Sequence, residues 1–144
     1  MKMNKIGEML KLGILSQYKK EKPLTYKIYN YLKKNATGYE KRVKSGVLMK
    51  EFNIHDNKTL RSYIEEIRNS GILQKIVCSE AGQHGGYWIA TNDEEVYQTL
   101  AHLYKRSMQM LKTYSTIKKK YKLDRQYRLK LSKYQKEMYE SIMR

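Results

Sequence analysis

Few side chains in this chain of 144 residues have the types and spacing that catalysis or metal binding needs. The candidates are His55, His84, His102 and Cys78, and their separations do not match the ligand spacing of zinc sites. No phosphate-binding glycine loop, no Gly-x-Ser-x-Gly elbow and no carboxylate pair in a pocket-like context occurs. The sequence therefore predicts no enzymatic activity, no metal and no cofactor.

Hydrogen bonding to the edges of bases is a chemistry that residues 57–70 could perform. The candidate contact side chains of this segment are Asn57, Lys58, Thr59, Arg61, Ser62 and Arg68. Arg61 can offer a two-pronged hydrogen bond to a guanine, and the amide of Asn57 can pair with an adenine. The lysine and the hydroxyls suit phosphates or bases, whereas Arg68, about two turns further on, is expected to meet the DNA backbone or solvent.

The same segment carries an apolar stripe, which predicts a helix. Leu60, Tyr63, Ile64 and Ile67 follow the i, i+3, i+4, i+7 spacing. Residues 53–56 have the composition of a turn, and His55 or Asp56 can cap the helix that follows. Gly71 is expected to accept the left-handed conformation that ends a helix.

Two helices are predicted before this one. The first spans residues 24–35, with Thr25 as its N-cap and an apolar face of Leu24, Ile28, Tyr31 and Leu32. A polar loop at 37–44 separates it from a short helix that Ser45 caps. That short helix is expected to turn Val47, Leu48 and Phe52 inward.

A β-hairpin is predicted after residue 71, with strands at 72–79 and 87–90 and a glycine-rich turn at 80–86. Gly82, Gly85 and Gly86 would let the turn bend tightly and approach a duplex, where Gln83 and His84 could form hydrogen bonds. Trp88 is expected to anchor the returning strand in the core rather than to stack on bases.

The two ends of the chain extend this central region of residues 23–92. Residues 1–22 form an amphipathic segment that either packs on the domain, the commoner outcome, or lies on a membrane surface. Asn92 is expected to cap a basic helical extension at 93–144, interrupted near Asp124. Its 3-4 apolar spacing permits a coiled coil with a second copy, or folding back within the chain.

Charge points to a polyanionic partner. The chain has 30 Lys and Arg against 14 Asp and Glu, a net charge of +16. Residues 105–144 have thirteen basic and three acidic residues, a net of +10, so Lys118, Lys119 and Lys120 are candidates for clamping phosphates. We expect dimerisation through this extension combined with non-specific DNA affinity.

Localisation is expected to be cytoplasmic, in association with the bacterial nucleoid. The lone cysteine gives no disulfide framework, which fits a reducing interior. Residues 1–20 lack the pattern of a signal peptide, and no apolar run approaches the roughly 18 residues of a membrane-spanning helix. No membrane partner is therefore expected.

The order helix, short helix, turn, helix and hairpin resembles the winged helix-turn-helix proteins of Firmicutes phages and mobile elements. The resemblance covers about residues 24–104, and its carriers are Leu48, Ile54, Leu60, Arg61, Ile64, Ile67, Gly71 and the run GGYWIATNDEEV. The stretch between Ile54 and Leu60 is one residue longer than a tight helix-turn-helix allows. The expected fold is mainly α with a small β-hairpin, a winged helix-turn-helix followed by a basic helical extension.

This resemblance implies a sequence-specific duplex-DNA-binding protein that serves in transcription regulation or DNA replication. It would read the major groove with helix 57–70 and contact the backbone or minor groove with the wing at 80–86. The alternative is a protein-interaction module that binds a host or replisome protein and has little specific DNA binding. Single-stranded or RNA binding through the tyrosines is disfavoured, because most of them have core-facing spacing.

Overall fold

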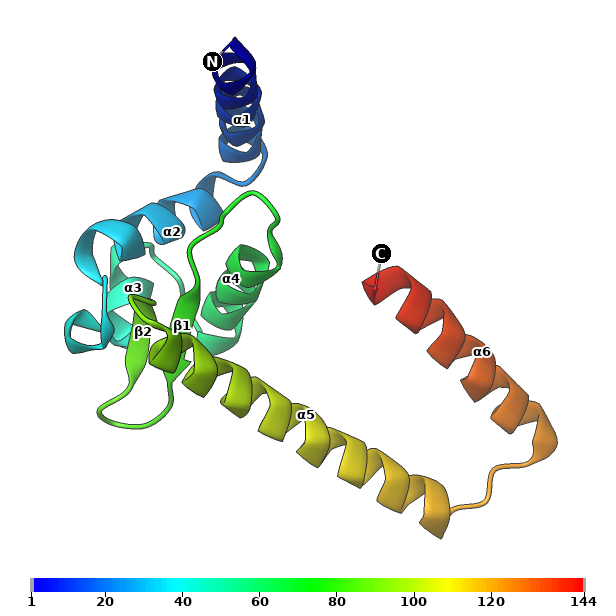
Figure 1. The fold of residues 1–144 in the computed structure, drawn as a ribbon. Coiled ribbons are helices and arrows are strands. Elements are labelled where there is room, and N and C mark those ends of the chain that lie inside the picture. Colours follow the sequence, from blue (N-terminus) through cyan, green and yellow to red (C-terminus); the bar gives the residue numbers. More distant parts are fainter. Residues whose placement is uncertain (1, 144) are drawn as a thin grey trace. The chain divides into compact units, whose positions relative to one another are not determined.

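The computed structural model describes residues 2–143, with side chains from residue 5 onward. The chain divides into two compact units, Met1–Ala101 and His102–Arg144. Its helices are α1 (Lys2–Glu21), α2 (Pro23–Asn35), the 3-10 turn η1 (Tyr39–Lys41), α3 (Ser45–Glu51), α4 (Asn57–Asn69), α5 (Asp93–Lys120) and α6 (Arg125–Ile142). The strands are β1 (Val77–Glu80) and β2 (Gly86–Ile89) (Figure 1). The prediction of a mainly helical fold with a small hairpin is thus confirmed.

The core of the first unit lies among α2, α3, α4 and the two strands. Its fully buried residues include Ile28 and Leu32 of α2, Leu48 of α3, and Leu60 and Ile67 of α4. These positions are the apolar stripes of their helices, and burying them together stabilises the unit by the hydrophobic effect. Val47 does not join them, contrary to prediction, because α3 turns its side chain outward and leaves it 49% exposed.

The two strands pair antiparallel, with Cys78 opposite Trp88. The other edge of β2 is paired as well. The amide of Tyr87 donates to the carbonyl of Val43 at 2.8 Å and the amide of Val43 donates to Tyr87 at 2.9 Å, while Ile89 donates to Ala36 at 2.7 Å. The polar loop predicted at 37–44, together with Ala36, therefore supplies backbone partners to β2 and joins the end of α2 to the hairpin.

The first predicted strand was too long. Residues 72–76 are irregular and β1 begins only at Val77, although the whole stretch is rich in β-branched residues. The amide of Lys75 donates to the phenol oxygen of Tyr29 at 3.2 Å, and Ala90 donates to the carbonyl of Ile76 at 2.9 Å. The tertiary contacts of this segment thus override its local strand preference.

Three predicted helix ends were also wrong. α2 begins at Pro23, so Thr25 lies inside its first turn, where it is buried and donates to Glu66 Oε2 at 2.9 Å. Lys44, not Ser45, occupies the N-cap position of α3. Gly71 is absent from the left-handed region, because α4 ends at Ser70 in an extended conformation. The serine hydroxyl accepts from the amides of Ile72 and Leu73, which turns the chain without glycine.

The N-terminal amphipathic segment forms one helix, α1, which runs through both Gly7 and Gly13. Only its last turns meet the core, through Leu15 and Tyr18. From residue 5 onward, the other large apolar side chains of α1 are exposed: Ile6, Met9, Leu10, Leu12 and Ile14. The expectation that this segment packs on the domain therefore holds only for its C-terminal part.

The predicted cap of α5 is confirmed, since Asn92 Oδ1 accepts from the amide of Glu95 at 3.0 Å. Glu95 lies in the first turn of α5, where the helix dipole favours a carboxylate, and it also forms hydrogen bonds outside the helix. Its carboxylate accepts from the amides of Thr91 and Tyr39, each at 2.8 Å, which ties the start of α5 to η1. Burial works against the charged form, yet these hydrogen bonds lower the pKa of Glu95 overall.

The second unit consists of the greater part of α5 and the whole of α6, in line with the predicted interruption near Asp124. The chain leaves helix at residues 121–124, and Asp124 Oδ1 accepts from the amide of Tyr127 at 3.1 Å as the N-cap of α6. The side-chain amide of Gln135 in α6 donates through Nε2 to the phenol oxygen of Tyr114 in α5. Within residues 102–143 only Leu123 and Leu131 are even half-buried.

Candidate nucleic-acid interface

The N-terminus of α4 is fixed by Asp56. Its carboxylate accepts from the backbone amide of Thr59 at 2.7 Å and from the hydroxyl of the same residue at 3.0 Å. These bonds lower the pKa of Asp56, with the backbone amide contributing most. A helix start held in this way gives the side chains of the first turns a defined direction.

Five of the predicted contact residues form an exposed polar face on α4. They are Asn57, Lys58, Thr59, Arg61 and Ser62. Arg61 Nε donates to the carbonyl of Asn57 at 3.3 Å and the hydroxyl of Ser62 donates to Lys58 at 3.1 Å, both within the helix. Arg61 is exposed and a guanidinium carries five N–H donors, so α4 offers hydrogen-bond donors outside its buried stripe.

Arg68 lies in a different environment. Its Nε donates to the carbonyl of Val77 at 2.9 Å and its Nη2 donates to Ser79 Oγ at 2.9 Å. The side chain is half-buried and bridges the last turn of α4 to strand β1. Instead of facing the DNA backbone or solvent, this arginine holds the hairpin against α4.

The wing turn at 81–85 owes its shape to glycines. Gly82 has a φ of +99°, and its carbonyl accepts from the amide of Gly85 at 3.1 Å. A Cβ on Gly85 would lie 2.0 Å from the carbonyl oxygen of Glu80. Gly85 and Gly86 are thus required by the protein's own backbone, while Gln83 and His84 stand exposed at the tip.

Arg42, which the sequence did not single out, holds the wing from outside. Its Nε donates to the carbonyl of His84 at 2.7 Å and its Nη1 donates to the carbonyl of Tyr39 at 3.1 Å. The guanidinium also stacks on the ring of Tyr39, 4.1 Å from its centroid. No motif marks an arginine in a polar loop for this purpose, because the pairing depends on contacts across 42 residues.

Trp88 is buried, 5% exposed, as predicted. Its indole meets the ring of Tyr39 edge to face, with centroids 5.1 Å apart. Tyr39 therefore lies between the tryptophan of β2 and the arginine that holds the wing. The ring stack fixes the base of the hairpin without using the wing tip.

α4 is also tied to the α1–α2 junction by Glu66. Lys22 Nζ lies 2.9 Å from Glu66 Oε1, and Thr25 donates to the other carboxylate oxygen. The hydrogen bond from Lys22 lowers the pKa of Glu66 most; burial opposes this change and Thr25 adds to it. The rear of α4 is thereby held in register with α2.

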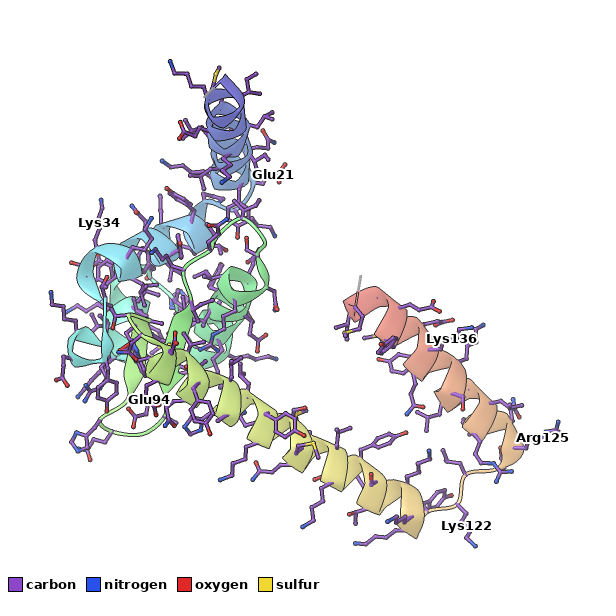
Figure 2. All side chains as sticks on the ribbon, viewed as in Figure 1. Glu21, Lys34, Glu94, Lys122, Arg125 and Lys136 are labelled. Atoms are coloured by element: carbon purple, nitrogen blue, oxygen red, sulfur yellow. The ribbon has the colours of Figure 1, made fainter. Side chains whose placement is uncertain are left out.

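The three remaining predicted contacts, Lys118, Lys119 and Lys120, lie in the other unit. All are exposed at the end of α5, and the Lys118 ammonium lies 5.8 Å from the Tyr114 ring centroid. Other cations of this unit, among them Lys122, Arg125 and Lys136, also extend into solvent (Figure 2). The structure thus brings together the α4 and wing residues within Met1–Ala101, and leaves the lysine run in His102–Arg144.

Among residues 2–143, no helix is both long and apolar enough to cross a bilayer. In the same part of the chain, no group of three His, Cys, Asp or Glu side chains could hold a metal ion. The chain matches no protein-family model, no curated protein and no solved structure.

Proposed function

We propose that residues 23–92 form a winged helix-turn-helix that binds duplex DNA with sequence preference. The order of elements supports this: α2, the segment 36–43, α3, α4, β1 and β2. The pairing of Val43 with Tyr87 adds a short third strand position to the hairpin. The connection between α3 and α4 is five residues long, from Phe52 to Asp56.

The observation that carries the proposal is the exposed polar face of α4. An α-helix fills the major groove of B-DNA, and its N-terminal half meets the base edges. On α4, Asn57, Lys58 and Arg61 are exposed in that half, and the Asp56 cap fixes their positions. Arg61 would hydrogen-bond a guanine, Asn57 an adenine, and Lys58 a phosphate.

The wing would contact the flanking backbone or minor groove. Gln83 and His84 are exposed at its tip, and Arg42 donates a hydrogen bond to the backbone carbonyl of His84. The net charge of +16 would draw the protein to the polyanion, with the lysine run of α5 adding sequence-independent affinity. Such a protein would act by occupying DNA, as a transcriptional regulator or replication-associated factor on the bacterial nucleoid.

The test is the fluorescence anisotropy of labelled duplexes from the neighbourhood of the gene, titrated over a range of salt. Arg61→Ala should weaken binding to the preferred duplex by about 1–3 kcal/mol and reduce sequence preference. Lys27→Ala removes the same charge from the exposed face of α2 and should change affinity little. Arg61→Lys keeps the charge but loses the planar two-pronged geometry, so it should retain overall affinity and lose part of the sequence preference.

Two outcomes would reject the proposal. Equal binding to every duplex, unchanged by Arg61→Ala, would leave only electrostatic attachment. No binding at low salt would favour the protein-interaction module instead. A phosphate contact at Lys58 can be recognised separately, because Lys58→Ala should reduce the slope of log K against log salt by about one.

A further inference from the structure

We infer that the α5–α6 pair is an interface for a second copy of this chain. The apolar face that would form it, here called the C-terminal seam, comprises Leu103, Met110, Tyr114 and Ile117 of α5, Tyr121 directly after α5, and Tyr127, Leu131, Tyr134 and Met138 of α6. On each helix these residues follow an alternating spacing of three and four, apart from one gap of seven at Ser107. That spacing is typical of helices that pack along their length.

Apart from the half-buried Leu131, the C-terminal seam is exposed in the described part of a single chain. Met110 is 72% exposed, Ile117 61% and Tyr121 70%. At the joint of the two helices, a hollow lined by Tyr114, Ile117, Lys118, Tyr121, Leu123 and Leu131 exposes almost only apolar atoms. Monomeric proteins rarely leave a contiguous apolar surface of this kind in water.

The area available suits a stable dimer. Tyr114, Tyr121, Tyr127 and Tyr134 are 36, 70, 54 and 59% exposed. With roughly 200 Å² for a whole tyrosine, the four rings alone present about 440 Å². A standard interface buries about 800 Å² per partner, and the aliphatic members of the C-terminal seam can supply the rest.

A second copy is the occupant that needs nothing beyond this chain. Two helices with apolar seams do not enclose a core, whereas four do, and two identical pairs supply four. Closed twofold pairing is also the commonest form of self-assembly. The basic side chains lie off the seam, at positions such as Lys105, Lys112 and Lys119, where their ammonium groups can stay in water.

The charge of the unit gives this association a distinctive salt dependence. Each copy brings thirteen basic and three acidic residues between positions 105 and 144. The flanks of two copies therefore repel one another, and salt screens that repulsion. Self-association should strengthen with salt, whereas binding to DNA or to an acidic protein would weaken.

The experiment is sedimentation equilibrium of the full chain without DNA, at about 0.1 M and about 1 M salt, where the Debye length falls from about 10 Å to about 3 Å. We expect a dimer whose dissociation constant falls severalfold at the higher salt. Met110→Gln and Ile117→Gln should each shift the equilibrium toward monomer by tenfold or more. Glutamine is a good helix former, and far-UV circular dichroism of the dilute protein checks that each variant keeps its helices.

Two variants serve as controls. Met108→Gln makes the same substitution two residues from Met110, about 150° around α5 from the middle of the seam, and should leave the dimer intact. Leu10→Gln alters the exposed apolar face of α1 and should do the same.

The inference is overturned by a monomer at every concentration and salt, by a dimer that salt weakens, or by a dimer that Met110→Gln and Ile117→Gln leave intact. A dimer lost in Leu10→Gln would likewise assign the interface to α1. Because DNA is absent from the experiment, its result is independent of whether α4 binds DNA.

Discussion

Arg42 Nε donates a 2.7 Å hydrogen bond to the backbone carbonyl of His84. This contact joins the loop before α3 to the tip of the wing. The guanidinium is held in turn by the carbonyl and ring of Tyr39, which packs on Trp88. The direction of the wing is therefore set from the buried ring outward, through a single half-buried arginine.

Replacing Arg42 should loosen the wing. Arg42→Ala removes two charge-assisted hydrogen bonds from a half-buried position and should lower the free energy of unfolding by about 1–2 kcal/mol. DNA affinity should fall by more than the loss of one positive charge explains. The effect of losing the charge alone is measured with Lys41→Ala, because Lys41 is an exposed neighbour with the same charge. Urea denaturation and duplex titration of both variants provide the comparison. Equal effects of the two substitutions on stability and DNA affinity would contradict the role of Arg42 in holding the wing.

The two arginines of α4 should separate stability from binding. Arg68→Ala breaks the hydrogen bonds to Val77 and Ser79 and should cost about 2–3 kcal/mol of unfolding free energy. Arg61→Ala removes an exposed side chain and should change stability by no more than about 0.5 kcal/mol. Urea denaturation of both variants decides the matter. If the Arg68→Ala protein is as stable as the wild type, the structural role of Arg68 is contradicted and it is again a candidate DNA contact.

The decrease in the free energy of unfolding at acid pH should depend on Glu66. Its pKa in the folded protein is lowered by Lys22 and Thr25, so the ionised carboxylate stabilises the fold above the unfolded pKa of about 4.3. That contribution is lost as the pH falls through the folded pKa. Glu66→Gln should therefore be less stable near neutral pH, by up to about 1 kcal/mol because the pair is partly exposed, with the difference vanishing in strong acid.

Urea denaturation at several pH values tests this expectation. Glu65→Gln is the control, because the carboxylate of Glu65 neighbours Glu66 in the sequence but is exposed. A difference between wild type and Glu66→Gln that persists at about pH 2, below both pKa values, would contradict the electrostatic origin.

The wing glycines should differ in what they tolerate. Gly85→Ala forces a Cβ to within 2.0 Å of the Glu80 carbonyl oxygen, and relieving that overlap should cost about 2–3 kcal/mol. Gly82→Ala meets no neighbour and suffers only from its φ of +99°, a cost of about 1 kcal/mol. Urea denaturation ranks the two. The reverse order would mean that the turn has another conformation.

The sequence predicted best those features in which local signals and packing agree. α4 was placed within one residue of its observed end, because its stripe, the Asp56 cap and the core all favour the same helix. The burial of Trp88 followed from the size of its ring. At the candidate site, the same periodicity predicted the exposed residues at the start of α4, and the glycine-rich composition of residues 80–86 predicted the turn that exposes Gln83 and His84.

The sequence could not predict features that depend on distant partners. Thr25 has the side chain of a helix cap, but its hydroxyl bonds to Glu66, 41 residues away. Arg68 has the spacing of a surface residue, yet its guanidinium donates a hydrogen bond to the carbonyl of Val77 in β1. The pairing of Val43 with Tyr87 likewise requires the hairpin to exist first, and so the sequence of residues 37–44 predicts only an ordinary polar loop.

The only tryptophan of the chain, Trp88, is buried beneath Tyr39 in the first unit, and the second unit has none. Excitation at the red edge of the indole band will therefore report the melting of Met1–Ala101 alone. Far-UV circular dichroism, in contrast, weights the helices of both units. If the seam helices depend on a second copy for their order, the two signals should melt apart in dilute protein and converge as its concentration rises.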